Sequence, residues 1–353
     1  MIIPYRGYGT TQKIYVKGHV LDDRLLYESH HKDKRRKNIR AMLSRYMSSS
    51  LPDISVEVHF NDARTIVTTD ENGLFEATLE LSKPAEPGWH NISYYVLDEI
   101  VENQEPLEEK GQVFINDQQS DFAVVSDVDD TILISHATQA LRKLRLILTK
   151  NSKTRLPFTG VAAFYQALVA QHDNNIQKPI FYVSSSEWNL YDFLEDFCDV
   201  RKIPKGCFML QELKTSLWKL LQSGGGTHQH KKDKVLHLLD VFPQQKFILI
   251  GDSGQHDASL YKSIVQERPG RILAIYIRDV GKSSHARKVN KIAETMGNEV
   301  EMVLVEDSNE AAQHAYEKGF ISKEGKKRVA QEFVEQLAKP KSLVEQVVEE
   351  KND

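Results

Sequence analysis

A short apolar run that ends in a cluster of acids constrains this chain more than any other stretch does. Residues 122–132 read Phe-Ala-Val-Val-Ser-Asp-Val-Asp-Asp-Thr-Ile. The apolar, β-branched start is typical of a buried strand, and the acids that follow predict carboxylates at the carboxyl edge of a sheet. In α/β proteins this edge is where ligands bind. The stretch therefore predicts an α/β fold with a ligand site directly after the strand.

The acids of this stretch restrict the chemistry that it can support. Asp127 and Asp129 are two residues apart, so in an extended turn their side chains point the same way and their charges repel each other. A divalent cation would relieve that repulsion, and Mg²⁺ prefers oxygen ligands and often shares its shell with substrate phosphate. Phosphoryl chemistry is the leading interpretation. A solvated Asp-rich turn after a core strand is the alternative.

Three further features follow in the chain. Residues 180–186 form a second apolar run, which ends in hydroxyls suited to hydrogen-bonding a phosphate. Residues 247–257 form a third apolar run, which ends in Asp252 and Asp257. Between them Lys231 lies just ahead of a predicted helix, whose apolar face carries Val235, Leu238 and Leu239. Each feature alone has an ordinary reading as a turn serine, a helix-capping aspartate or a solvated lysine, but their joint occurrence in this order favours one functional site.

This order resembles the four motifs of the haloacid dehalogenase superfamily of phosphotransferases. More narrowly, four segments resemble the catalytic domain of the actin-patch phosphatidate phosphatase family: residues 126–132, 156–160, 182–190 and 242–254. The resemblance covers about residues 120 to 285. One departure is Glu187, which stands where the family usually has Pro after the third serine position.

The resemblance implies a two-step hydrolysis of a phosphomonoester. Asp127 is expected to attack phosphorus and form an aspartyl phosphate, and Asp129 to protonate the leaving oxygen and then activate water. A Mg²⁺ ion is expected on Asp127, the backbone carbonyl of Asp129 and Asp252, with Asp257 just outside, orienting water or the lysine. The residues expected to bind the phosphoryl group are Thr131, Ser184, Ser185 and Lys231.

Two questions stay open at this level. Lys232 and Lys234 compete with Lys231 for the phosphate-binding role. The resemblance implies that the substrate is phosphatidate at a membrane surface, hydrolysed to diacylglycerol and phosphate. A soluble phosphomonoester and a non-catalytic interaction scaffold are the alternatives, although the presence of all four key aspartates weighs against a scaffold.

The hydrophobic pattern divides the chain. From about residue 13 to residue 116 apolar and polar residues alternate between Gly- and Pro-bearing turns, which predicts a small antiparallel β-sandwich. The later alternation of strands and helices predicts a doubly wound, largely parallel, Rossmann-like sheet. The expected domains are a β-sandwich-like accessory domain over 1–118, a haloacid dehalogenase-like phosphatase domain over 119–320 and a charged helical tail over 321–353.

Composition limits the expected partners and location. The formal net charge of −4 gives no global reason to expect nucleic acid, and no stretch approaches the ~20 apolar residues of a membrane span. The two cysteines imply no disulfide framework, so a cytoplasmic location is expected. Basic residues in segments 34–37 and 142–145 would support peripheral association with anionic lipid. A solvated insertion is the more ordinary reading of the first segment.

Overall fold

The computed structural model of the chain describes residues 1–22, 50–100, 102, 104, 106–128, 159–170, 176–211, 227–254, 256–281, 283–297 and 300–338. The chain divides into two compact units. One consists of Met1–Val125, Gln171–Phe193 and Gly206–Phe247, and the other of Ser126–Ala170, Leu194–Lys205 and Ile248–Asp353. The domain boundaries expected at residues 118 and 320 stay a prediction. Asp129, Thr131 and the two basic segments lie outside the described residues.

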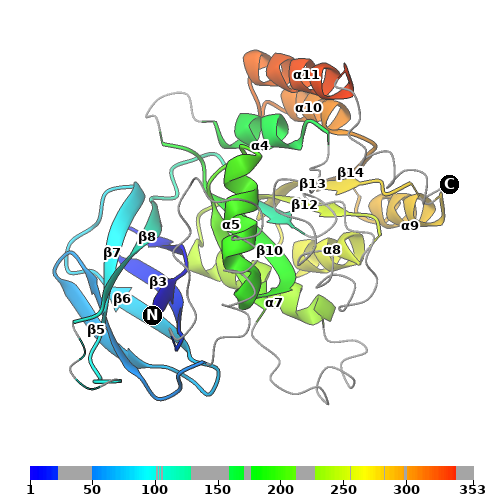
Figure 1. Cartoon of the computed structure of the whole chain (residues 1–353). Coiled ribbons are helices and arrows are strands. Elements are labelled where there is room, and N and C mark those ends of the chain that lie inside the picture. The colour runs from blue at the N-terminus through cyan, green and yellow to red at the C-terminus, as the bar shows by residue number, and fades with distance from the viewer. Residues whose placement is uncertain are drawn as a thin grey trace. The chain divides into compact units, whose positions relative to one another are not determined.

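The amino-terminal strands form one eight-stranded sheet (Figure 1). Its strands are β1 (Ile2–Pro4), β2 (Gly7–Thr10), β3 (Lys13–Val20), β4 (Ser55–Phe60), β5 (Ala63–Thr68), β6 (Leu74–Glu80), β7 (Gly88–Val96) and β8 (Glu108–Asn116). Their order is β1-β3-β2-β8-β7-β4-β5, with β6 on β3. The predicted antiparallel pairing holds for most neighbours, but β2 and β8 pair in parallel. The expected sandwich is therefore corrected to a mixed sheet that curls around its core.

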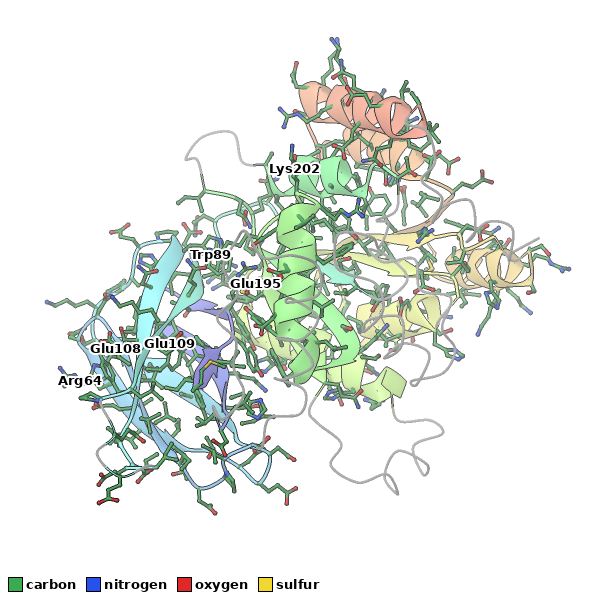
Figure 2. All side chains as sticks on the ribbon, in the orientation of Figure 1. Arg64, Trp89, Glu108, Glu109, Glu195 and Lys202 are labelled. Atoms are coloured by element: carbon green, nitrogen blue, oxygen red, sulfur yellow. The ribbon has the colours of Figure 1, made fainter. Side chains whose placement is uncertain are left out.

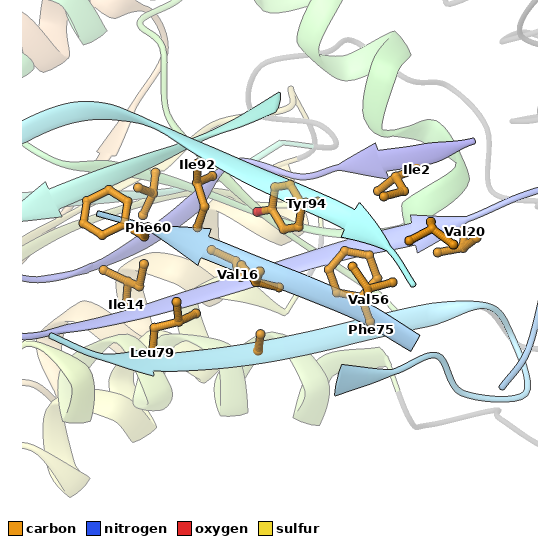
Figure 3. Close-up of a cluster of buried hydrophobic side chains, with 14 of the residues drawn as sticks. Ile2, Ile14, Val16, Val20, Val56, Phe60, Phe75, Leu79, Ile92 and Tyr94 are labelled. Carbon is orange, nitrogen blue, oxygen red and sulfur yellow. The ribbon is translucent and has the colours of Figure 1, made fainter. Parts of the chain in front are cut away.

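The inner face of this curled sheet is apolar because its strands alternate with period two. In β4, for example, Val56, Val58 and Phe60 are buried and alternate with half-buried residues. Figure 3 shows these inward side chains gathered with Phe75 and Tyr94, whose ring centroids lie 5.6 Å apart. Such burial contributes about 25 cal/mol per Å² of apolar surface, so the alternation seen in the sequence accounts for the core.

A second sheet contains the motif-bearing strands. These are β9 (Ala123–Asp127), β10 (Ile180–Glu187), β11 (Cys207–Gln211), β12 (Phe247–Asp252), β13 (Ile272–Arg278) and β14 (Glu301–Val305), in the order β11-β10-β9-β12-β13-β14. The pairs β10–β11 and β13–β14 are parallel. A mixed α/β fold with a parallel sheet is thus confirmed, whereas the doubly wound Rossmann-like layout stays a prediction.

Helices separate these strands along the chain. They are α4 (Val161–Val169), the 3₁₀ turn η1 (Trp188–Leu190), α5 (Tyr191–Val200), α7 (Thr227–Val241), α8 (Asp257–Glu267), α9 (Ser283–Glu294), α10 (Ser308–Glu317) and α11 (Lys323–Ala338). The predicted apolar face of α7 is confirmed, because Val235, Leu238 and Leu239 are all buried. No helix among the described residues is long and apolar enough to cross a membrane.

Within the second unit α11 packs against α4 and α10 (Figure 1). Val329 of α11 is fully buried, and the Gln336 side-chain oxygen accepts a hydrogen bond from the Gly160 amide at 2.9 Å. At the other end of α4 the Gln166 amide donates to the carbonyl of Lys202, which follows α5 (Figure 2). The described part of the expected charged tail is therefore a docked helix.

Candidate functional site

Three buried carboxylates form the centre of the candidate site. Asp127, Asp252 and Asp257 each offer one carboxylate oxygen, and these oxygens lie within 4.8 Å of one another. Their exposed fractions are 1%, 0% and 0%, so water screens their charges little. All three belong to the second unit. The structure thus brings together three of the four aspartates singled out from the sequence, and the fourth, Asp129, lies outside the described residues.

Strand ends and a helix start place these carboxylates. Asp127 is the last residue of β9 and Asp252 the last of β12, and every residue of both strands is buried. Asp257 opens α8, where an acid is favoured by the helix dipole. Its Oδ2 accepts a hydrogen bond from the Asp252 amide at 3.1 Å, and Asp252 Oδ1 accepts one from the Gly254 amide at 2.6 Å. These bonds fix the turn between β12 and α8.

A glycine makes the close approach of Asp257 possible. A Cβ on Gly251 would lie 2.6 Å from Asp257 Oδ2 and 2.8 Å from its Cβ. Real side chains do not pack so closely, so any other residue at this position would displace the Asp257 carboxylate. Asp252 therefore supplies a carboxylate, and Gly251 leaves the space that the Asp257 carboxylate occupies.

The negative charge of this cluster contributes to the raised pKa values of two buried tyrosines, Tyr261 and Tyr165. Burial, followed by the charges of Asp257, Asp127 and Asp252, raises the pKa of Tyr261 well above its usual value. Burial is also the main cause that raises the pKa of Tyr165, and Asp127 adds to it. The hydroxyl of Tyr261 donates to the Ile250 carbonyl at 2.9 Å, and that of Tyr165 lies 2.6 Å from Ser126 Oγ. Both tyrosines therefore stay neutral, and Tyr261 contacts the backbone of β12 while Tyr165 contacts the Ser126 side chain of β9.

The three carboxylates fit a hard divalent cation. Bringing like charges together in a buried place is costly unless a cation or protons compensate them. Carboxylate oxygens are the ligands that Mg²⁺ prefers. The donor set therefore fits the expected metal, and it includes Asp257, whose carboxylate oxygen lies within 4.8 Å of an oxygen of each of the other two. The sequence analysis expected Asp257 outside the ligand set.

Three of the predicted phosphate-binding residues, Ser184, Ser185 and Lys231, lie in the first unit, and the fourth, Thr131, lies outside the described residues. Ser184 is fully buried, Ser185 is partly exposed and Lys231, on α7, is 4% exposed. Between the register pairs Val183–Met209 and Glu187–Gln211, β10 advances four residues while β11 advances two. The serine run therefore lies in an irregular stretch of β10, as is common beside functional sites. The side-chain effect of Glu187 lies outside what the structure describes.

The competing lysines of α7 differ in their surroundings. The Nζ of Lys234 donates to two backbone carbonyls, to that of Met209 at 3.0 Å and to that of Ser184 at 3.4 Å. Lys234 thus ties α7 to β10 and β11, which gives it a structural task. Lys232 is partly exposed, whereas Lys231 is buried on the same helix. The role of Lys231 as the phosphate ligand stays a prediction.

Sequence reasoning missed Tyr165 and Tyr261 as part of the site. One signal was available for Tyr261, because it follows Asp257 by four residues, and residues four apart share a helix face. Tyr165 carries no comparable signal, since its contact with Ser126 joins residues 39 positions apart.

Comparison with known proteins agrees with the motifs. Residues 122–279 match the family model of the phosphatidate phosphatase APP1 catalytic domain. Over 159 residues the chain is 30% identical to phosphatidate phosphatase APP1 of Saccharomyces cerevisiae, and over 163 residues it is 26% identical to an uncharacterised protein of Schizosaccharomyces pombe. The two alignments cover 44% and 45% of this chain but only 26% and 25% of the relatives. The chain thus matches about a quarter of the length of these curated relatives.

Solved structures add nothing to this comparison. A carbohydrate acetylesterase from Xanthomonas citri aligns over 84% of this chain and 66% of its own, at 10% identity and a TM-score of 0.30. Such a score is too low to support an argument about fold or activity. The sequence match is the informative one, and it confirms the family resemblance predicted from the motifs: residues 122–279 are similar to the catalytic domain of a phosphatidate phosphatase.

Proposed function

We propose that this chain is a Mg²⁺-dependent phosphatase that hydrolyses phosphatidate to diacylglycerol and phosphate through an aspartyl phosphate. The observation that carries the proposal is the buried cluster of Asp127, Asp252 and Asp257, within the segment that resembles a phosphatase catalytic domain. A cluster of strand-end carboxylates suits phosphoryl transfer, because a bound cation offsets charge on both the protein and the incoming phosphate.

The first step uses Asp127 as the nucleophile. A carboxylate oxygen of Asp127 attacks phosphorus, the bond from phosphorus to the ester oxygen breaks, and Asp129 gives its proton to that leaving oxygen. Diacylglycerol leaves and the phosphoryl group remains on Asp127. The role of Asp129 rests on the family resemblance.

The second step regenerates the enzyme. Asp129, now a carboxylate, takes a proton from water, and that water attacks the phosphorus of the aspartyl phosphate. The bond between phosphorus and the Asp127 oxygen breaks, inorganic phosphate leaves, Asp127 is again a carboxylate and Asp129 again carries a proton. Lys231, Ser184, Ser185 and Thr131 supply donors that position the phosphoryl group and stabilise the charge spread over its oxygens in the transition state.

The metal contributes charge compensation. Asp127, Asp252 and the backbone carbonyl of Asp129 would hold Mg²⁺, and Asp257 either joins them or orients water beside them. When bound, the cation neutralises charge on the phosphoryl oxygens and lets the carboxylates share one buried place. Backbone hydrogen bonds hold the carboxylates of Asp252 and Asp257 in place beside Asp127.

The direct test measures phosphate release from phosphatidate in mixed micelles and from a panel of soluble phosphomonoesters. We expect release from phosphatidate that stops after exhaustive chelation and returns with Mg²⁺. The control Asp127→Asn keeps the shape of the side chain but cannot form the acyl phosphate, so it should retain less than about a hundredth of the wild-type rate.

One result would contradict the role of the metal, and another would contradict the choice of substrate. Full activity after chelation, with no metal found by elemental analysis, would refute the metal. A preference for soluble esters over phosphatidate would show that phosphatidate is not the substrate, while the proposed reaction at phosphorus would remain.

A further inference from the structure

The amino-terminal sheet reaches the elements that carry the predicted phosphate-binding residues. Its contact segment, Tyr5 to Tyr8, follows β1 and includes the start of β2, and we call it the N-terminal clasp. The clasp lies in the same compact unit as Ser184, Ser185 and Lys231. Each of its four residues contacts at least one of η1, α5, β10, β11 and α7, and these contacts suggest a task for the sheet beyond folding.

Tyr5 supports the segment that follows the serine run. Its ring stacks on Trp188 with centroids 4.2 Å apart and planes inclined by 18°, and it also contacts the Tyr191 ring at 4.7 Å. Tyr5 and Trp188 are 2% and 5% exposed. Trp188 follows directly on the last residue of β10, so the stack holds the end of the irregular stretch that contains Ser184 and Ser185. Stacked aromatic pairs of this kind are among the stronger packing contacts.

Two hydrogen bonds join the backbone of the clasp to side chains of α5 and β11. The Arg6 amide donates to the Tyr191 hydroxyl at 2.9 Å, and the Gly7 carbonyl accepts from Cys207 Sγ at 3.1 Å. The Arg6 guanidinium lies 5.9 Å from the Trp89 ring of β7, a residue that Figure 2 labels. The clasp is thus bound to α5 and β11 in one direction and to the curled sheet in the other.

Tyr8 makes the corresponding contact with the lysine helix. Its hydroxyl lies 3.0 Å from His237 Nε2 on α7, and its ring meets Phe181 of β10 edge-on, at 5.7 Å. His237 lies six residues after Lys231 on the same helix. Tyr8 also pairs with Tyr15 on β3 and Phe114 on β8, so it is fixed within the curled sheet.

We propose that the N-terminal clasp positions the phosphate-binding residues, so that the curled sheet is a working part of the phosphatase rather than a detachable targeting module. Tyr5, at one end of the clasp, contacts η1, which directly follows the serine run. Tyr8, at the other end, contacts α7, which carries Lys231. This inference rests on the proposed function. Donors for a phosphoryl group act only when surrounding residues hold them within about 0.5 Å of the working geometry, and a shift of about 1 Å can cost a hundredfold in rate. Tyr5 is a positioning residue, since its described contacts are with protein side chains.

The test compares three variants of the full chain. Tyr5→Ala removes the stack, Tyr5→Phe keeps the ring, and Tyr94→Ala opens the core of the same sheet, because Tyr94 is fully buried beside Phe75. Each variant is assayed on a soluble phosphomonoester at a temperature at which circular dichroism shows it folded. We expect Tyr5→Ala to lose ten- to hundredfold in kcat/KM and to bind orthophosphate, measured as an inhibitor, correspondingly less well. Tyr5→Phe and Tyr94→Ala should stay within about twofold of the wild type.

A second readout separates this inference from the proposed function. Amide hydrogen exchange over residues 184–191 should become faster in Tyr5→Ala and should not change in Tyr5→Phe or Tyr94→Ala. This measurement needs no turnover, so it tests the clasp even if no phosphatase activity is found. If Tyr5→Ala does not fold, Tyr191→Phe replaces it, because it removes the acceptor of the Arg6 amide and keeps the ring. Unchanged exchange and unchanged orthophosphate binding in a folded clasp variant would overturn the proposal, as would equal losses in Tyr94→Ala.

Discussion

Gly251 shows how one residue without a side chain controls the carboxylate cluster. It precedes Asp252, the end of β12, and the space that its Cβ would need is filled by the Asp257 carboxylate. The Asp252 amide in turn donates to that carboxylate. A methyl group at residue 251 would push against the Asp257 oxygen and strain this hydrogen bond, so the three carboxylates would no longer converge.

Gly251→Ala should therefore weaken metal binding more than it weakens the fold. Overpacking at this position costs about 1–3 kcal/mol of stability, and the displaced carboxylate should lower Mg²⁺ or Mn²⁺ affinity by at least about tenfold, as loss of a supporting ligand contact does. Isothermal titration calorimetry measures the affinity. The matched control is Gly270→Ala, where φ is +76° and no atom lies within 4 Å of the added Cβ. That variant should lose stability but keep metal affinity. Equal affinities in both variants would show that Asp257 does not take part.

Two of the three clustered aspartates could be placed from the sequence, and the third could not. Asp127 and Asp252 could be placed from the sequence, because each ends a continuous apolar run and strand ends carry ligands in α/β proteins. The position of Asp257 could not, since it depends on the turn that Gly254 and Asp252 form after β12. A turn of this kind is set by local hydrogen bonds that motif spacing does not specify.

At the scale of elements, α7 carries three lysines in different environments. Lys231 is buried, Lys232 is partly exposed and Lys234 is bound to carbonyls of β10 and β11. Helix periodicity separates the apolar face of α7 from its polar face. It does not say which polar residue meets a neighbouring strand, so the choice among the lysines could not be made from the sequence.

Three single substitutions to Met separate these roles. Lys231→Met should lower kcat/KM about a hundredfold or more, because Met keeps the length of the side chain but offers no charge or donor to a phosphoryl oxygen. Lys234→Met removes two hydrogen bonds to backbone carbonyls and should lower the melting temperature. Lys232→Met is the control and should change neither quantity. A larger loss of kcat/KM in Lys234→Met than in Lys231→Met, with both folded, would reverse the assignment.

Strand prediction succeeds where alternation is long and fails where strands are short. The alternating runs at β3, β4, β6 and β7 were visible in the sequence. β1 and β2 have three and four residues, too few for a periodic pattern to appear. These two short strands flank or contain the N-terminal clasp, so a part of the sheet that contacts α5 and α7 could not be predicted from the sequence.

At the scale of the whole molecule, the amino-terminal sheet departs most from expectation. Its parallel pair joins Gly7–Thr10 to residues 113–116, which are more than a hundred positions away. Alternation shows which face of a strand is buried, but it does not show which distant strand pairs with it. The correction from an antiparallel sandwich to a mixed, curled sheet follows from that one long-range pairing.

The substrate is also a question at this scale, because a lipid phosphatase must bind a surface as well as a phosphate. Basic residues in segments 34–37 and 142–145 are the candidates from the sequence, and both segments lie outside the described residues. Each basic side chain near an anionic surface contributes about 1 kcal/mol, so a cluster of three or four can account for reversible attachment.

Neutralising either basic segment with Gln should weaken flotation with vesicles that contain phosphatidate and lower hydrolysis of bilayer phosphatidate. Hydrolysis of a small soluble ester should not change, because Asp127 acts on phosphorus whatever group carries it. Added salt should imitate the substitutions, since exposed charges are screened beyond a Debye length of ~10 Å at 0.1 M. A matched control replaces Lys323, Lys326 and Lys327 of α11 with Gln and should leave flotation unchanged. If vesicle binding survives neutralisation of both segments, or if soluble esters lose activity in parallel, surface attachment is not their role and a soluble phosphomonoester becomes the better substrate.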